Sequence, residues 1–290
     1  MSQTPASVVQ LTNVHVTYPG HPPLQAVRGV SFELFAGEVV GLVGESGSGK
    51  STVAKVLAGL IKPASGQIVY QGNPVTHRGV GRRPLNQTGI QMAFQDPGSS
   101  LNPRRRVGGQ IQDGLDLAER RRRELGVPGA PGQGNDGPST PEQWLERIGL
   151  AAKDQRRYPR SFSGGQRQRI ATARALAAEP DVLIGDEPIS ALDASTQARV
   201  AYLMSTLATA QGATLLFISH DLSVVRLIAD RLLVMYAGQI VEQGSTEQIW
   251  NQPRHPYTQS LLAAIPVPDG AGRLPKTLPL GTTFPPPLSD

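Results

Sequence analysis

The sequence predicts an α/β fold built on a mainly parallel sheet, because short apolar runs alternate with helical stretches. Val39 to Val43 is nearly continuous in apolar side chains and breaks at glycines, as in a strand buried on both faces. Similar runs return at Val182 to Ile184 and at Thr214 to Ile218, with a helical stretch between them. We therefore expect these runs to be strands of one sheet.

The first 36 residues have a different pattern, since apolar and polar side chains alternate there. Such an alternation indicates half-buried antiparallel strands. Gly66 to Tyr70 is expected to be a further strand. From Lys50 onward the apolar side chains recur at helical spacing, and they are Val53, Val56, Leu57 and Leu60.

The region from about Asp96 to Pro159 is more polar and richer in helix-forming residues. Glycines and prolines interrupt it between Gly126 and Pro141, which is typical of a surface loop. We expect a helical subdomain over about 96–165 that carries a flexible surface insertion. Beyond Asn251 the chain is rich in proline, so an extended tail is expected there.

The composition is that of an ordinary soluble protein, with 39% hydrophobic and 18% charged residues. No run approaches the roughly 18 apolar residues of a membrane-spanning helix. Cysteine is absent, which excludes disulfides, thiolate zinc sites and thiolate-held iron–sulfur clusters. The net charge of +5 does not decide the function, because glutamates flank the run Arg120 to Arg123 and favour a solvated helix face.

A glycine-rich loop at Gly44 to Ser51 fits the pattern G-x-x-x-x-G-K-[ST], between an apolar strand and a helix. Glycines let consecutive N–H groups point at phosphate oxygens, and the following helix presents its positive end to the same anion. Lys50 can reach the β- and γ-phosphates, and Ser51 can bind Mg²⁺. The sequence thus predicts binding of ATP and Mg²⁺, with the phosphates held by Gly44, Glu45, Ser46, Gly47, Ser48, Gly49, Lys50, Ser51 and Thr52.

Two acids, Asp186 and Glu187, end the apolar run that begins at Val182. An acid at the carboxyl end of a parallel strand lies where α/β sheets bind ligands. Asp186 is expected to hold Mg²⁺ through water, and Glu187 to act as the general base on the attacking water. Alone the pair is a weak signal, and the phosphate loop strengthens it.

These motifs resemble those of ABC-transporter ATP-binding subunits, over about Leu11 to Pro266. Ser163-Gly164-Gly165-Gln166 resembles the signature segment of that family. Physically it predicts a helix start, with Ser163 as the N-cap and Gln166 completing a capping box. The resemblance implies that this anion site closes on the γ-phosphate held by an opposite subunit.

Other residues carry over in the same way. Gln95, in Met92 to Pro97, resembles the glutamine that touches Mg²⁺ and water and links to the transmembrane partner. His220 resembles the histidine that senses the γ-phosphate, and Asp193 resembles the D-loop residue at the dimer interface. Tyr18 resembles the aromatic residue that stacks on adenine, although tyrosine is common on strands. The catalytic set is therefore expected to be Glu187, His220 and Gln95, and the metal set Ser51, Gln95 and Asp186.

The resemblance implies a P-loop NTPase (RecA-like) core with an antiparallel β subdomain, a helical subdomain and a C-terminal extension. Residues 1–250 would form the ATP-binding domain, and residues 251–290 an extension of the oligopeptide-transporter type. Phe94 to Arg104, Ser219 to Val225 and Arg254 to Thr258 are similar to the branch that serves dipeptide, oligopeptide and nickel importers. Nickel-type members often lack the extension, which favours peptides.

We expect an importer motor at the cytoplasmic face of the cell membrane, with ATP hydrolysis driving uptake through other chains. The implied partners are a second cassette, two membrane permease subunits and an extracytoplasmic solute-binding protein. A related second cassette is preferred over an identical one, and no nucleic-acid partner is expected. The alternatives are a nickel or metal-chelate importer, a soluble ATPase that acts on DNA or ribosomes, and a degenerate cassette that does not hydrolyse ATP. The short segment from 95 to 163 disfavours the DNA-acting class, which has a long coiled coil there, and Glu187 and His220 disfavour a degenerate cassette.

Overall fold

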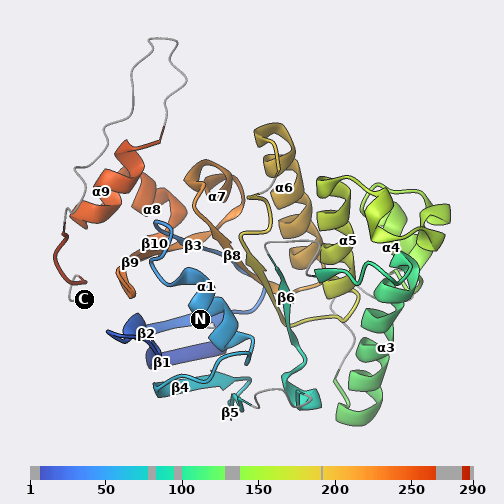
Figure 1. Ribbon diagram of the computed structural model, residues 1–290, viewed down its shortest axis with the longest axis horizontal. Helices are drawn as coiled ribbons and strands as arrows, with labels where there is room; N and C mark the ends of the chain where they lie inside the picture. The colour runs from blue at the N-terminus through green and yellow to red at the C-terminus, as the bar shows by residue number, and fades with distance from the viewer. Residues whose placement is uncertain are drawn as a thin grey trace, which may run out of the picture.

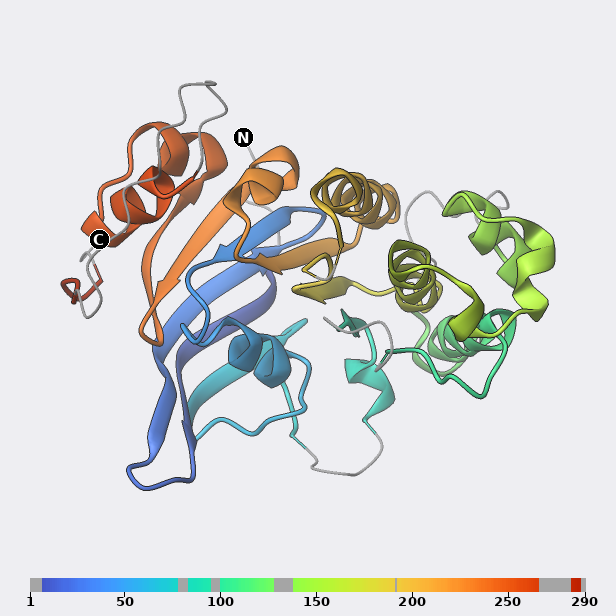
Figure 2. The same cartoon turned by 45° about the horizontal axis from the view of Figure 1, so that its top comes forward.

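Two β-sheets pack on a shared hydrophobic core in the computed structural model, and helices cover the remaining faces (Figures 1 and 2). The structure describes residues 7–77, 83–94, 100–127, 138–190, 192–265 and 283–287. The first sheet has the strand order β2-β1-β4-β5 and is antiparallel. Its strands are β1 (Ser7–Tyr18), β2 (Leu24–Phe35), β4 (Ser65–Tyr70) and β5 (Asn73–Pro74). This confirms the alternation read from the sequence.

The second sheet has the order β10-β9-β3-β8-β7-β6, and its strands from β9 to β6 run parallel. Only β10 pairs antiparallel, at one edge. The strands are β3 (Val39–Val43), β6 (Ile90–Ala93), β7 (Val182–Asp186), β8 (Thr214–Ser219), β9 (Arg231–Tyr236) and β10 (Gln239–Ser245). The mainly parallel sheet expected from the sequence is therefore confirmed.

The parallel sheet is buried on both faces because successive side chains alternate between two cores. In β3, Val40 and Leu42 join the core shared with the antiparallel sheet, whereas Val39 and Val43 join the core beneath the helices. Helix α1 (Lys50–Leu57) belongs to the first core. The helices that contribute to the second core include α5 (Gly164–Leu176), α6 (Ala194–Ala210), α7 (Leu222–Ile228) and α8 (Thr246–Asn251).

Helix α1 ends sooner than its apolar spacing suggests. Gly59 adopts a left-handed conformation, and the N–H groups of Gly59 and Leu60 bond to the carbonyls of Val56 and Lys55. This Schellman arrangement stops the helix. Leu60 consequently lies beyond the helix and is 54% exposed, so the helical spacing read from the sequence does not extend to it.

The helical subdomain lies at the end of the molecule beyond β6 (Figures 1 and 2). It contains α3 (Val107–Leu125) and α4 (Pro141–Arg147), followed by the 3₁₀ turns Ala152–Arg156 and Pro159–Ser161. Thr140 caps α4 in a capping box, and Trp144 is fully buried. Residues 128–137 of the expected insertion and residues 95–99 lie outside the described residues.

One arginine of the run in α3 points inward rather than to solvent. Arg121 is 4% exposed, and its guanidinium pairs with Asp181 at 2.7 Å and donates to the Glu179 carbonyl at 2.6 Å. Tyr70 of β4 donates to the same carboxylate. The prediction of a solvated helix face is therefore wrong for Arg121. This junction ties the helical subdomain and the antiparallel sheet to the segment just before β7.

The C-terminal region departs from the expected extended tail. Helix α9 (Pro256–Ala263) begins with a proline at its first turn, where the missing N–H costs no hydrogen bond. Tyr257 in this helix is fully buried, and Phe284 from the described segment 283–287 packs on the same core. Residues 256–263 are thus part of the folded core, and the proline-rich composition was misleading there.

Removing the Arg121 charge should destabilise the fold, because Asp181 would keep a half-buried charge without its cation. For Arg121→Met, which keeps much of the side-chain length, we expect a loss of about 3 kcal/mol in the free energy of unfolding by urea. Arg123→Met on the same helix is the control, since this arginine is exposed, and its effect should stay within about 0.5 kcal/mol. Equal effects of the two substitutions would contradict the buried junction.

Candidate functional site

The glycine-rich loop connects the end of β3 to the start of α1, near the middle of the molecule (Figure 1). Gly44 and Gly49 have left-handed backbone angles that disfavour other residues. Added Cβ atoms would lie 2.1 Å from the Met235 carbonyl oxygen and 2.3 Å from that of Ala26, respectively. Glycine is thus required at both positions, because neighbouring backbone approaches the loop closely.

Lys50 is folded back into the loop that precedes it. Its ammonium donates to the carbonyl oxygens of Gly44 at 2.8 Å and Glu45 at 2.7 Å. Burial lowers the pKa of Lys50, whereas the charges of Glu187 and Asp186 raise it. A desolvated cation enclosed by backbone is suited to meet the oxygens of a phosphate group.

Asp186 lies at the end of β7, facing the first turn of α1. The Ser51 hydroxyl donates to Asp186 Oδ1 at 2.7 Å, across two elements that are far apart in sequence. Burial raises the pKa of Asp186, and the Ser51 hydrogen bond opposes that shift. Carboxylate and hydroxyl oxygens are the donors that Mg²⁺ prefers. Within the described ranges no group of three or more His, Cys, Asp or Glu side chains could hold a metal, so a bound Mg²⁺ would need further oxygens from phosphates or water.

Glu187 and His220 meet where the neighbouring parallel strands β7 and β8 end. The backbone of Glu187 has a φ of 46°, an angle that non-glycine residues seldom adopt, and its N–H bonds to the Ile218 carbonyl at 3.0 Å. The His220 Nδ1 lies 3.6 Å from Glu187 Oε2, and the imidazole is largely exposed. Glu187 thus follows β7 in a strained turn that puts its carboxylate next to His220.

The segment Ser163 to Gln166 forms the capping box predicted for it. The Gln166 N–H bonds to Ser163 Oγ at 3.3 Å, and Gln166 Oε1 accepts from the Ser163 N–H at 2.9 Å. Gly164 and Gly165 pack against Leu192 and Thr196, where Asp193 caps α6. In both views α5 lies apart from α1, so the two predicted phosphate-binding elements do not meet within one chain (Figures 1 and 2).

Of the two remaining predicted residues, the structure describes Tyr18 but not Gln95. The Tyr18 hydroxyl lies 3.3 Å from Thr52 Oγ1, which puts its ring beside the end of the glycine loop. Gln95 lies outside the described residues.

The sequence analysis assigned no role to Tyr257, although the Glu45 N–H donates to its hydroxyl at 2.9 Å. These residues are more than 200 positions apart in the chain, so no local pattern could have paired them.

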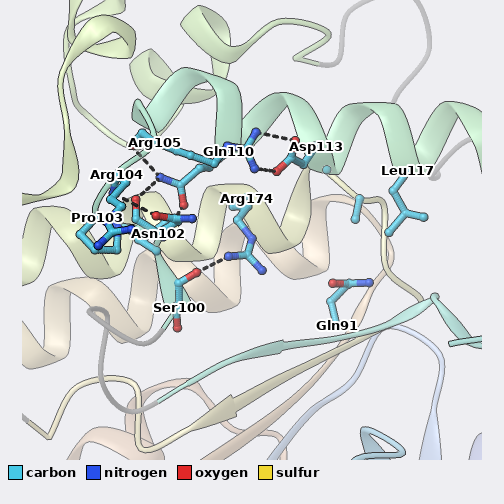
Figure 3. A pocket seen from close by; sticks show the side chains of 13 residues that line it. Gln91, Ser100, Asn102, Pro103, Arg104, Arg105, Gln110, Asp113, Leu117 and Arg174 are labelled. Carbon is cyan, nitrogen blue, oxygen red and sulfur yellow. Dashed lines mark hydrogen bonds and ion pairs between the residues drawn. The ribbon is translucent and has the colours of Figure 1, made fainter. Parts of the chain in front are cut away.

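A polar groove of about 740 Å³ lies between α3 and the segment that follows residue 99 (Figure 3). Gln110 bonds to Asn102 and to the Arg105 carbonyl, while Arg105 pairs with Asp113. Arg174 of α5 donates to the Ser100 carbonyl. These hydrogen bonds and the ion pair fix the side chains that line the groove, and Arg174 connects α5 to the residues after position 99.

None of the helices in the described part of the chain is long and apolar enough to cross a membrane.

Two family models match this chain. The model described as "ABC transporter" matches residues 27–190, and the model described as "Oligopeptide/dipeptide transporter, C-terminal region" matches residues 241–285. The first spans more than half of the chain and covers the glycine loop, α5 and the acid pair.

Curated relatives agree with these models. The chain is 43% identical over 272 residues to the oligopeptide transport ATP-binding protein OppF of Streptococcus mutans, with 93% of this chain and 85% of the relative covered. It is 44% identical over 247 residues to the dipeptide transport ATP-binding protein DppF of Escherichia coli, with 84% and 70% covered.

A solved structure supports the fold. An ATP-binding cassette in a dimeric post-hydrolysis state, bound to ADP and Pi, matches with a TM-score of 0.65 and 27% identity. The match covers 82% of this chain and 98% of that chain. The expected P-loop NTPase core is thereby confirmed.

The buried charge of Asp186 should cost stability at neutral pH. Because its pKa is raised on folding, the folded protein holds a proton that the unfolded chain has already lost, so stability falls as pH rises through this window. Asp186→Asn removes the charge and keeps an acceptor for Ser51. We expect a higher Tm at pH 7 without nucleotide, and a gain that disappears below about pH 4, where the unfolded carboxyl is protonated.

Glu119→Gln, at an exposed acid in the interior of α3, is the matched control and should leave the Tm unchanged at both pH values. A lower Tm for Asp186→Asn at pH 7 would show that the carboxylate is stabilising.

Proposed function

The chain belongs to the ABC transporter family, and we propose that it is the ATP-hydrolysing subunit of an importer for dipeptides or oligopeptides. The observation that carries this proposal is the meeting of Lys50, Asp186 and Glu187 at one edge of the parallel sheet. The loop after β3 and the acids after β7 come together because β8 pairs with both strands. Family membership makes the chain an ATP hydrolase, and the following steps assign its residues.

The triphosphate of ATP binds along the Gly44 to Thr52 loop. Lys50 exchanges its two backbone carbonyls for β- and γ-phosphate oxygens, and the start of α1 faces the same charge. Tyr18, beside Thr52, is in position to stack on the adenine. Ser51 and Asp186 would hold Mg²⁺, which neutralises charge on the phosphates as it develops.

Glu187 acts as the general base on the water that attacks the γ-phosphate. Its backbone is strained at the end of β7, and His220 Nδ1 lies 3.6 Å from its carboxylate. His220 is thus placed to respond to the state of the γ-phosphate next to Glu187. General-base catalysis of this kind contributes about 10² to 10⁴ in rate.

The site is completed by a second cassette. The start of α5 presents the N–H groups of its first turn and the Ser163 hydroxyl to an anion, and α5 lies apart from this chain's own loop. The γ-phosphate that it meets is therefore bound by another subunit, and this chain's ATP is closed in the same way. We favour a related, non-identical cassette as the partner.

Two membrane permease subunits convert this closure into transport, and an extracytoplasmic binding protein delivers the solute. The groove lined by Ser100 to Arg105 supports a docking place for a permease segment, because these residues follow Gln95 in the sequence, and Gln95 resembles the glutamine that links to the transmembrane partner (Figure 3). Docking there puts the chain at the cytoplasmic face of the membrane. The match of residues 241–285 and the names of the two relatives support peptides as the solute.

Glu187→Gln should bind ATP but hydrolyse it at least about 100-fold more slowly in the assembled transporter, because the amide cannot take the proton from water. Phosphate release and ATP binding are measured separately. Glu146→Gln, at an exposed acid on α4, is the control and should keep the parent rate. If Glu187→Gln hydrolysed ATP as fast as the parent, the base would be another group.

Purification of the tagged chain from solubilised membranes should recover integral membrane subunits and a second cassette of different sequence. Mass spectrometry identifies both. A second copy of this chain in place of a different cassette would contradict the preferred pairing. Recovery with ribosomes or DNA, and without membrane subunits, would overturn the importer proposal.

A further inference from the structure

The segment Arg254 to Thr258 distinguishes the C-terminal region in the sequence, and the structure shows where its tyrosine goes. His255 is the N-cap of α9, and its Nδ1 accepts from the Tyr257 N–H at 3.2 Å. With Pro256 at the first helical position, this cap fixes the helix start so that Tyr257 points into the core. The Tyr257 side chain is completely buried.

The ring of Tyr257 is held by two other aromatic rings. Its centroid lies 4.5 Å from that of Tyr236 in β9 and 5.3 Å from that of Phe284. The residue after Phe284 is also fixed, because the His255 Nε2 lies 3.2 Å from the Pro285 carbonyl oxygen. Since Nδ1 accepts a hydrogen bond, Nε2 is the nitrogen that donates to Pro285. The described segment 283–287 thus packs against the Tyr257 ring and holds it in this position.

The hydroxyl of this immobilised ring contacts the phosphate loop. It accepts the hydrogen bond from the Glu45 N–H at 2.9 Å. That N–H belongs to the same peptide group as the Gly44 carbonyl, which accepts from Lys50 Nζ at 2.8 Å. A trans peptide is planar, with its N–H and C=O on opposite sides. Tyr257 and Lys50 therefore hold the two sides of one peptide group.

We propose that Tyr257 is a positioning residue for the phosphate loop, and that the C-terminal region acts on ATP binding through it. The hydroxyl fixes the rotation of the Gly44–Glu45 peptide, and with it the start of the loop that receives the phosphates. A loop that is already ordered loses less conformational entropy when ATP binds. Burial raises the pKa of Tyr257, so the phenol stays neutral and the contact persists at physiological pH.

The neighbouring residue offers a matched control. Thr258 is as buried as Tyr257, yet its hydroxyl has no hydrogen-bond partner among the residues that the structure describes. Thr258→Val therefore removes a buried hydroxyl from the same helical turn without changing any contact of the phosphate loop. Tyr257→Phe removes one oxygen and keeps the aromatic packing with Tyr236 and Phe284.

The test measures Mg²⁺-ATP binding to the full chain by calorimetry, with inorganic tripolyphosphate as a competitor that lacks the base. For Tyr257→Phe we expect about fivefold weaker binding of ATP, and the same factor for tripolyphosphate, because the effect acts on the phosphates. Thr258→Val should match the parent for both. Hydrogen exchange at the Glu45 amide should be faster in Tyr257→Phe only.

Unchanged ATP binding in Tyr257→Phe, or a loss for ATP without a loss for tripolyphosphate, would overturn the inference, even if the Tm fell. The inference rests on the proposal that ATP phosphates bind this loop, and Lys50→Ala separates the two. If Lys50→Ala binds ATP as the parent does, the proposed site fails. If Lys50→Ala loses binding and Tyr257→Phe does not, only the role of Tyr257 fails.

Discussion

The glycine loop around the Lys50 ammonium is the feature on which the rest of the site depends. The hydrogen bonds from Lys50 to the Gly44 and Glu45 carbonyls keep a desolvated cation inside a ring of backbone. Such a loop needs backbone angles that side chains oppose, and close neighbours such as the Met235 and Ala26 carbonyls leave no room for a Cβ. The shape of the loop is therefore limited by the neighbouring strands β9 and β2 as well as by its own hydrogen bonds.

The order of the parallel strands places the acidic side chains and the histidine next to this loop. β3 carries the loop, β8 pairs beside it, and β7 comes next, so the acids that end β7 and the histidine that follows β8 arrive at one edge. Two polar contacts then join the parts, a hydrogen bond of 2.7 Å from Ser51 to Asp186 and a longer contact of 3.6 Å between His220 and Glu187. Burial of Asp186 and Lys50 opposes their charged forms. The fold therefore loses some stability in order to keep a site that can bind a charged substrate.

The regions outside the parallel core are linked to it by buried polar contacts. Arg121 binds the helical subdomain to Asp181 just before β7, and Tyr70 of the antiparallel sheet meets the same carboxylate. At the opposite end of the molecule, Tyr257 joins α9 to the phosphate loop. Each contact lies close to a strand that carries part of the site. The helical subdomain and the C-terminal region are thus each joined by a polar contact to a part of the chain next to the site.

The sequence by itself determined the elements whose signals are local. The apolar runs predicted the strands, the spacing of glycines and lysine predicted the loop, and Ser163 with Gln166 predicted a capping box, because each depends on residues a few positions apart. Tertiary structure alone decided the inward turn of Arg121, the folding of residues 256–263 onto the core, and the contact of Tyr257 with Glu45. Those outcomes depend on which distant segments become neighbours. Whether a charge or a hydroxyl is buried follows from that arrangement, so the local sequence around the residue cannot predict it.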